Sequence, residues 1–228
     1  MQKGSIHLTP RLEAAADLAG TGGTVADIGT DHAYLPCFLL EEGRFQKAIA
    51  ADIAPGPLMN AKKTVENLGL EERVSLRLCP GLDGIEEGEA DTVTVAGMGG
   101  EMIASIILID KKYPRYILQP MSTEERLRKS LAEGGFLIEK ELLVREGTRI
   151  YTVICARYDG KARAFTEAEY YIGRVYRDNP KDIASGYMKK KKLALMKSVE
   201  GNLTAGHPEE AERAGQILRE IEEYETQF

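Results

Sequence analysis

Short apolar runs alternate with amphipathic segments along the first 135 residues of the chain. The apolar runs, at 24–28, 47–53, 73–78, 92–96 and 116–119, are short enough for strands and predict them there. The segments beside them carry apolar residues at helical spacing and predict helices at 8–20, 33–42, 57–68, 101–110 and 122–133. Strands that alternate with helices form βαβ units, so we expect an α/β fold with a mostly parallel sheet.

Local signals refine the ends of these elements. Thr9 and Pro10 stand where an N-cap and a first helical residue are expected. Pro120 should stop the fifth strand, and Ser122 with Glu125 has the spacing of a capping box for the next helix. Two longer strand candidates follow, at 136–144 and 149–158. The link between them is so short that they should form an antiparallel hairpin.

The pattern changes after Gly160, where strand signals end. Helices are expected at 166–177, 184–200 and 208–224, with breaks at 179–180 and 201–206. The last two should pair antiparallel, as a short coiled coil. The apolar residues expected to face one another are Leu193, Met196 and Val199 on one helix and Ile217, Leu218, Ile221 and Tyr224 on the other. We therefore divide the chain into a main domain at 1–160 and a helical domain at 161–228.

Charge is divided unevenly within the helical domain. Residues 161–197 carry ten Lys and Arg against four Asp and Glu, and residues 200–228 carry two against eight. The run Lys189, Lys190, Lys191 and Lys192 would lie beside the acidic last helix. Either the two charges neutralise each other on a solvated hairpin, or the lysines reach a phosphate backbone.

The composition excludes several classes of protein. No apolar run approaches the ~20 residues that span a membrane, and the start of the chain lacks the pattern of a signal peptide. The three cysteines are widely spaced and odd in number, which argues against a disulfide framework and a structural zinc site. We expect a cytoplasmic protein with no membrane contact, no metal and no protein partner, as a monomer or weak dimer.

Most of the candidate chemistry lies between Val25 and Pro36, where a buried strand runs into a turn and a helix. Gly29 follows the strand and would let a ligand approach the backbone. Asp27 precedes it, and Asp52 closes the next strand at about the spacing of a carboxylate that binds a ribose. The turn has one glycine instead of the three of a dinucleotide fingerprint, which favours a nucleoside without phosphates, such as S-adenosylmethionine. Alternatively, Asp27 only caps the turn and Asp52 only ends a strand.

Two further groups surround this turn. The segment Ala96-Gly97-Met98-Gly99-Gly100 follows the fourth strand and offers bare backbone carbonyls and amides to a ligand, or is simply a tight turn. Asp31 could stabilise a cationic product, and His32 either contributes to the site or serves the turn. Tyr34 offers a flat ring on which a base taken from its stack could lie.

The runs 26–36 and 96–100, with Leu118-Gln119-Pro120 after them, resemble the bacterial tRNA (adenine-22-N1)-methyltransferase family. Thr9-Pro10-Arg11-Leu12 and the Gly56-Pro57 pair fit the same family. The resemblance covers residues 8 to about 157 and the helical segment in outline. It implies a Rossmann-like class I methyltransferase that moves the methyl group of S-adenosylmethionine to N1 of an adenine in tRNA.

The residue patterns above, together with the resemblance, predict residue roles. The expected catalytic residues are Asp31 and Tyr34. The expected cofactor-binding residues are Asp27, Gly29, Asp31, His32, Asp52, Ile53, Gly81, Leu82, Ala96, Gly97, Met98 and Gly99. The expected substrate-binding residues are Arg11, Tyr34, Gln119, Pro120, Tyr151, Lys189, Lys190, Lys191 and Lys192.

The chain departs from the family pattern at three places. Cys79-Pro80-Gly81 stands where Gly-Asp-Gly is usual, Met121 replaces an asparagine, and Asp52 replaces a glutamate. The first affects a cofactor contact and the second the substrate side. A methyltransferase for another RNA or a small molecule, or a member that binds without turnover, are the alternatives.

Overall fold

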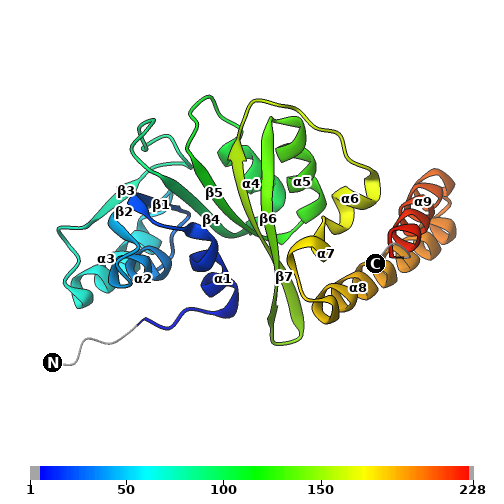
Figure 1. Ribbon diagram of the computed structural model, residues 1–228, viewed down its shortest axis with the longest axis horizontal. Coiled ribbons are helices and arrows are strands. Elements are labelled where there is room, and N and C mark those ends of the chain that lie inside the picture. Colours follow the sequence, from blue (N-terminus) through cyan, green and yellow to red (C-terminus); the bar gives the residue numbers. More distant parts are fainter. Residues whose placement is uncertain (1–5, 226–228) are drawn as a thin grey trace.

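The computed structural model describes residues 6–225, in which one seven-stranded sheet lies between helices (Figure 1). The strands are β1 (Gly22–Ile28), β2 (Phe45–Asp52), β3 (Val74–Leu78), β4 (Thr92–Gly99), β5 (Arg115–Ser122), β6 (Phe136–Glu146) and β7 (Arg149–Tyr158). Their order across the sheet is β3-β2-β1-β4-β5-β7-β6, and β7 alone runs antiparallel to its neighbours. The predicted Rossmann-like methyltransferase sheet, closed by an antiparallel hairpin, is confirmed.

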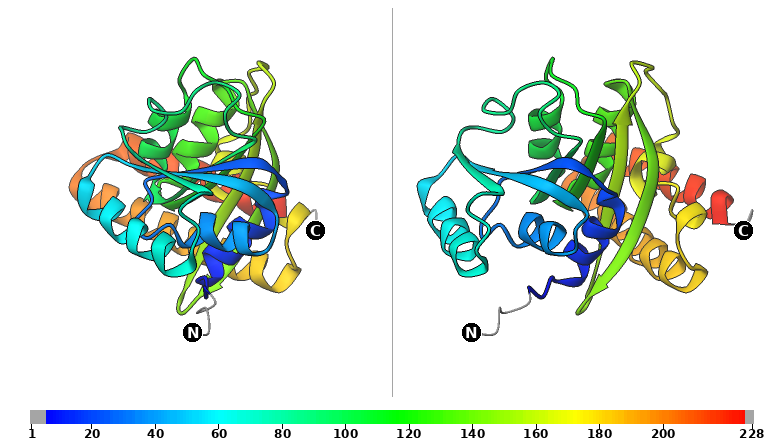
Figure 2. Two further views of the ribbon diagram at one scale, coloured as in Figure 1. Left: turned by 90° about the vertical axis from the view of Figure 1, so that its left-hand side faces the viewer. Right: turned by 60° about the vertical axis from the view of Figure 1, so that its left-hand side comes forward.

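Helices cover both faces of this sheet (Figure 2). One face packs against α1 (Pro10–Ala19), α2 (Tyr34–Glu41) and α3 (Pro55–Leu68), and the other against α4 (Gly100–Ile107) and α5 (Glu124–Glu133). Successive strand residues point to opposite faces, so Ile117 joins the first hydrophobic cluster and Leu118 the second. The predicted helices of this part are present, with shifted ends.

The ends of β4 and β5 differ from the prediction. β4 continues to Gly99, and β5 runs through Pro120 to Ser122. Pro120 is tolerated because β5 pairs with β7 only from Tyr116 to Leu118, and its pairing with β4 becomes irregular beyond Ala96. A proline without an N–H therefore costs no regular ladder hydrogen bond at this position.

The predicted capping box at Ser122 and Glu125 is wrong. Ser122 belongs to β5, and Thr123 precedes the helix in the left-handed conformation, with φ of 53°. The Thr123 hydroxyl accepts the N–H of Gly100 at 3.1 Å, so a contact with another helix has taken the group that would cap this one.

The C-terminal part consists of α6 (Glu167–Ile172), α7 (Val175–Asp178), α8 (Lys181–Ala205) and α9 (Pro208–Glu225). The single helix predicted at 166–177 is divided at Gly173, which has φ of +70°. A Cβ there would lie 2.3 Å from Oε2 of Glu141, so only glycine fits at this break, beside the buried carboxylate. A capping box does form in this part, between Thr166 and Glu169.

The helices α8 and α9 form the predicted antiparallel pair, on the side of the sheet where β6 lies (Figure 1). The helix α8 passes through Gly201 and ends at Ala205, with Gly206 as its C-cap, because an isolated glycine inside a helix is tolerated. The predicted packing of Leu193 and Met196 is wrong, since both are about half exposed. Leu195 is buried instead, because it continues the inward stripe of Ala184 and Met188.

The edge of the sheet formed by β6 is covered by residues 178–179, which lead into α8. Asp178 accepts the N–H of Glu141 on β6 at 3.0 Å, and Asn179 accepts the N–H of Leu143 at 2.6 Å. Asn179 also donates to the carbonyl of Glu141 at 2.8 Å. Side chains of the C-terminal part thus form hydrogen bonds with backbone groups of the edge strand β6 that no neighbouring strand pairs with.

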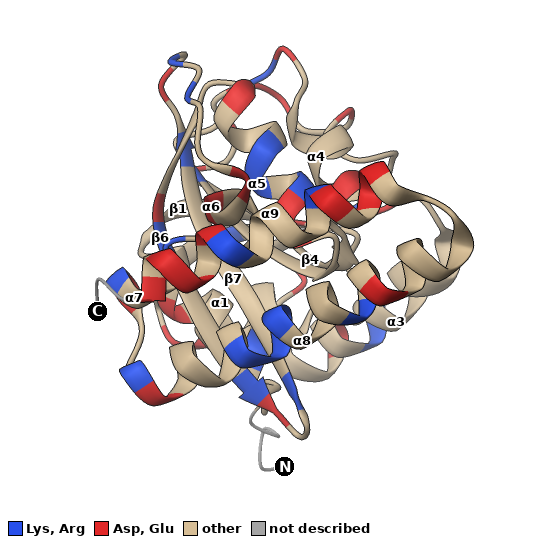
Figure 3. Ribbon diagram, turned by 90° about the vertical axis from the view of Figure 1, so that its right-hand side faces the viewer, with Lys and Arg blue, Asp and Glu red and all other residues tan. Residues whose placement is uncertain are grey.

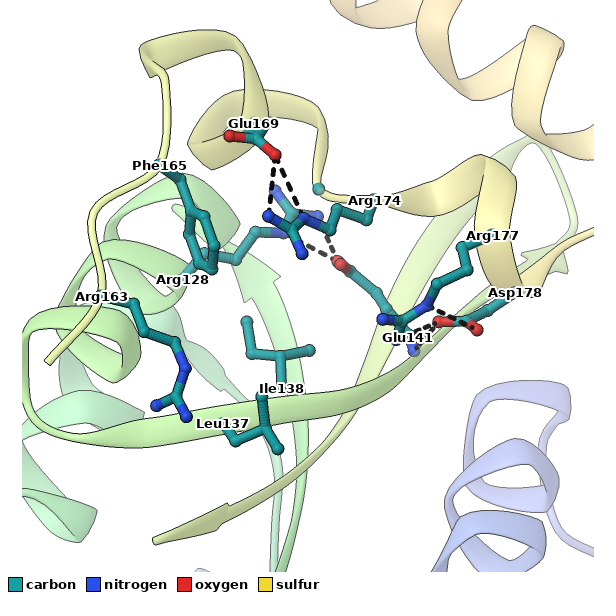
Figure 4. Close-up of a pocket in the computed structure, with 11 residues that line it drawn as sticks. Arg128, Leu137, Ile138, Glu141, Arg163, Phe165, Glu169, Arg174, Arg177 and Asp178 are labelled. Carbon is teal, nitrogen blue, oxygen red and sulfur yellow. Dashed lines mark hydrogen bonds and ion pairs between the residues drawn. The ribbon is translucent and has the colours of Figure 1, made fainter. Parts of the chain in front are cut away.

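A buried ion pair lies where the C-terminal helices meet the sheet (Figure 4). The guanidinium of Arg128 donates to Glu141, to the carbonyls of Tyr170 and Tyr171 and to the hydroxyl of Tyr187. A small cavity of about 100 Å³ adjoins it. The other arginines that line this cavity are paired with carboxylates, namely Arg163 with Asp159, Arg174 with Glu169 and Arg177 with Asp178.

No helix within residues 6–225 has both the length and the apolar character needed to cross a membrane. Residues 1–5 of the predicted main domain and 226–228 of the predicted helical domain lie outside the described residues.

Candidate active site

A cleft of about 380 Å³ lies at the carboxyl ends of β1 and β4, beside the start of α1. This is the edge of a parallel sheet where ligands bind in open α/β folds. The predicted site residues that line the cleft are Arg11, Asp27, Gly29, Asp31, His32, Tyr34, Ala96 and Gly97.

Asp27 brings a buried carboxylate to the floor of the cleft. Thr94 on the adjacent strand donates its hydroxyl to Oδ1 of Asp27 at 2.6 Å. Burial raises the pKa of the Asp27 carboxyl, hydrogen bonds from Thr94 and Thr30 oppose the shift, and the nearby charge of Asp52 adds to it. Sequence reasoning missed both threonines. For Thr94, a hydroxyl residue within a buried β-strand was the available signal, because such a group needs a partner.

Gly29 has the conformation that the turn requires. Its φ is +74°, and a Cβ at this position would lie 1.8 Å from Cε of Met98. Met98 does not line the cleft with the residues above, but its side chain packs directly on the Gly29 turn. The turn after β1 and the end of β4 are therefore in contact.

His32 and Tyr34 form a flat pair at the cleft. Their rings are stacked with centroids 5.0 Å apart and planes 6° from parallel, and Tyr34 is 43% exposed. Asp31 is well exposed, with Oδ2 at 3.3 Å from Nε2 of His32. The predicted residues thus present a ring surface and a carboxylate side by side.

Arg11 reaches the cleft from the first turn of α1. It forms an ion pair with Glu146 at the tip of the β6–β7 hairpin, and its guanidinium lies 5.4 Å from the centre of the Tyr151 ring. Tyr151 is buried. Its contact with Arg11 makes it a support for that residue.

The second carboxylate, Asp52, ends β2 beside the Gly29 turn. Gly29 and Thr30 donate their N–H groups to the carbonyl of the preceding residue, Ala51. Oδ1 of Asp52 accepts the N–H of Ala54 at 2.7 Å, and Oδ2 has no hydrogen-bond partner among residues 6–225. Asp52 is not among the cleft-lining residues. Asp27 and Asp52 are neighbours only in that β1 and β2 are paired and end side by side.

The other predicted cofactor residues differ in accessibility. Ile53 is exposed next to Asp52, whereas Leu82 is buried in the core, so its side chain is not available to a ligand. The turn that carries Cys79 and Gly81 is tied to β2, because the Cys79 N–H donates to the carbonyl of Asp52 at 3.0 Å.

The glycine segment 96–100, at the carboxyl end of β4, uses some of its amides internally. Gly97 donates its N–H to Oε1 of Gln119 at 3.2 Å, and Gly100 donates to Thr123. The amides of Gly97 and Gly100 are thus not available to a ligand, and Gly99 forms part of the strand. Gln119 and Pro120 are buried, and Sδ of Met121 lies 3.7 Å from the Gln119 amide nitrogen. Gln119 therefore holds the segment in place.

The four lysines of the run 189–192 in α8 divide into two pairs. Lys189 and Lys190 are exposed, whereas Lys191 binds Glu124 of α5 and Lys192 forms an ion pair with Glu225 of α9. Figure 3 shows the basic positions of α8 beside the acidic positions of α9. The mutual neutralisation considered above holds for Lys192 only.

Comparisons with known proteins identify the family of this chain. The family model described as "Methyltransferase domain" matches residues 8–154. A Bacillus subtilis tRNA (adenine(22)-N(1))-methyltransferase is 37% identical over 164 residues, which are 70% of this chain and 69% of the relative. The chain belongs to this methyltransferase family.

Solved structures of relatives extend the likeness to the whole chain. M. capricolum TrmK in complex with the cofactor product S-adenosyl-homocysteine is 28% identical, with a TM-score of 0.81 and coverage of 94% of this chain and 98% of the relative. A Streptococcus pneumoniae protein in complex with S-adenosyl-L-methionine is 30% identical, with a TM-score of 0.80 and coverage of 95% and 99%. The C-terminal helices therefore belong to the shared family architecture.

Within the described residues, no group of three His, Cys, Asp or Glu is arranged to hold a metal ion. The chemistry of the cleft is that of carboxylates, hydroxyls and aromatic rings.

Proposed function

We propose that this chain transfers the methyl group of S-adenosylmethionine to N1 of adenine 22 in tRNA. The observation that carries the proposal is the cleft at the ends of β1 and β4. There a buried acid and a left-handed glycine adjoin an exposed pair of stacked rings. Family membership supplies the reaction and the substrate class.

The residues of the cleft, together with those at the neighbouring end of β2, suit S-adenosylmethionine. Asp27, on the floor of the cleft, can accept a hydrogen bond from an ammonium group. The free oxygen of Asp52 can accept from a ribose hydroxyl, and the exposed side chain of Ile53 can pack on a base. The cavity is large enough for part of a nucleoside, and the Gly29 turn allows close approach to the backbone.

The target adenine would lie against His32 and Tyr34. An exposed flat ring is a sequence-tolerant surface for a base taken out of its stack, and base stacking on an aromatic residue is worth ~1–3 kcal/mol. Arg11, fixed by Glu146 and Tyr151, is placed to meet the RNA backbone at the same cleft.

The reaction depends on the alignment of adenine N1 with the methyl group more than on acid–base catalysis. S-adenosylmethionine supplies an electrophilic methyl group when bound, and adenine N1 already has a lone pair, so no general base is required. The chain must hold the base in line and exclude water, and such positioning contributes ~7–11 kcal/mol in favourable cases. Asp31, beside the stacked rings, can stabilise the positive charge that the adenine acquires.

We assign the cofactor and the reaction to residues 1–160 and additional tRNA contacts to residues 161–228. Within the lysine run 189–192 of α8, Lys189 and Lys190 are exposed and therefore available to phosphates. We propose that the protein acts in the cytoplasm as a monomer or weak dimer.

The test is methyl transfer to an unmodified tRNA with labelled cofactor, followed by mapping of the modified base. Label at N1 of adenine 22, and none in a tRNA with guanine at that position, is the expected result. Label at another position would replace the proposed substrate. Cofactor binding without transfer to any tRNA would favour a binding protein.

A further inference from the structure

Lys191 lies within the lysine run of α8 but is not a surface residue. Its side chain is 14% exposed, its amine lies 4.8 Å and 5.5 Å from the ring centres of Tyr171 and Tyr187, and Nζ is 3.3 Å from Oε2 of Glu124. Burial alone would lower the pKa of Lys191, but Tyr187 and Glu124 outweigh it and raise the pKa. The amine is therefore charged and held in place.

Its partner, Glu124, is the first residue of α5, and its carboxylate is 17% exposed. Burial would raise the pKa of this carboxyl, but the charge of Lys191 and further contacts lower it below its usual value. The ion pair thus joins the C-terminal helices to the point where β5 passes into α5.

The residue before Glu124 bears directly on the cleft segment. Thr123 has a left-handed backbone, which for a β-branched residue costs of order 1–3 kcal/mol and persists only where the surroundings enforce it. Its hydroxyl accepts the N–H of Gly100, and its carbonyl would lie 2.4 Å from a Cβ at Gly100. The turn at Thr123 is therefore pressed against the end of the glycine segment.

The other end of the glycine segment, at Gly97, is held by β5, the strand that precedes the turn at Thr123. Gly97, which lines the cleft, donates to Gln119 of β5, and Met98 packs on the Gly29 turn. Movement of the β5–α5 turn would displace residues 97–100 and alter the cleft wall. A shift of about 1 Å in a reacting geometry can cost ~100-fold in rate.

We propose that Lys191 is a positioning residue, which through Glu124 and Thr123 fixes residues 97–100 and so aligns the reacting groups. The inference rests on the proposed function for its effect on methyl transfer. Its structural part, the control of residues 97–100 from α8, does not depend on which RNA is methylated.

The experiment compares Lys191→Met with Lys192→Met in the full-length protein. Lys192 is the matched control, because it is adjacent on α8 and its partner Glu225 lies on α9, away from the cleft. Hydrogen exchange of the peptide 97–101, measured without cofactor or RNA, should be at least ~10-fold faster in Lys191→Met and unchanged in Lys192→Met. Lys191→Arg, which keeps the charge, should restore most of the protection.

Steady-state kinetics add the catalytic readout. We expect Lys191→Met to lower kcat at least ~10-fold, with the KM for tRNA within about threefold of the wild-type value. A raised KM with unchanged kcat would show that Lys191 only binds RNA and would overturn the proposal. Equal effects in the two methionine variants would also overturn it, because they would reflect general loosening of the helical pair.

Two further measurements keep the outcomes distinct. If Lys191→Met does not fold, Glu124→Gln takes its place, since it removes the same ion pair and keeps the side-chain shape. If the wild-type protein methylates no tRNA, the proposed function fails. The exchange comparison then still decides the positioning role, and unchanged exchange in Lys191→Met would refute it.

Discussion

Replacement of Arg128 by methionine should destabilise the protein strongly, although the residue is remote from the cleft. Arg128 and Glu141 are 2% and 3% exposed, and Nε and Nη2 of Arg128 reach Oε1 of Glu141 at 2.8 Å and 2.5 Å. Removing one partner leaves the other charge buried without compensation, which costs ~3–5 kcal/mol. Two carbonyls, of Tyr170 and Tyr171, would lose their donor in the same change.

The magnitude can be checked by urea unfolding followed by circular dichroism. The matched control is Arg126→Met, two residues earlier on α5, whose ion pair with Glu101 is largely exposed and worth ~0–1 kcal/mol. The double variant Arg128→Met with Glu141→Leu should regain much of the loss, because an apolar pair of similar volume needs no compensation. If Arg128→Met costs no more than Arg126→Met, the reasoning about this buried pair is wrong.

Three further predictions concern the cleft and the lysines. Burial raises the folded-state pKa of Asp27, so the folded chain binds more protons than the unfolded one between the two pKa values, and stability falls as pH rises through the folded pKa. Asp27→Asn should remove this loss in pH-dependent thermal unfolding and weaken cofactor binding at least ~10-fold by calorimetry; retention of full affinity would contradict the assigned role. Asp52→Ala should also weaken cofactor binding at least ~10-fold while the fold persists, and an unchanged affinity would mean that the ribose is placed wrongly. Lys189→Gln with Lys190→Gln should lower tRNA affinity and reduce the salt slope by about 1 for each lysine, without effect on cofactor binding, and an unchanged slope would remove both from the interface.

The sheet and its ligand edge could be predicted because local signals and tertiary packing agree there. Alternating apolar runs fixed the strands, and the short link after Glu146 fixed the hairpin. Asp27 and Gly29 could be placed at this edge because a strand, a turn and a helix follow one another within a few residues. The strand, turn and helix that position these two residues are local elements, and the order of apolar residues and glycine predicts them.

The misses share one physical cause, which is that a distant partner decides the outcome. The hydroxyl of Thr123 accepts a hydrogen bond from Gly100 instead of capping its own helix. The helix break at Gly173 lies so close to the Glu141 carboxylate that only glycine fits there. The amides of the glycine segment face Gln119 and Thr123, which no local pattern reveals. Lys191 looked identical to its neighbours in the sequence, and only the packing of α8 on α5 separates them.

The hydrogen bonds that Asp178 and Asn179 make to β6 bear on how the chain can be divided. A fragment that ended at Tyr158 would keep every strand but expose the amides of Glu141 and Leu143 along its outer rim. Such a rim is a template on which another strand can dock, and it favours self-association. Asp178 and Asn179 therefore protect the edge strand from pairing with another chain. A catalytic fragment that does not aggregate would have to extend at least through Asn179.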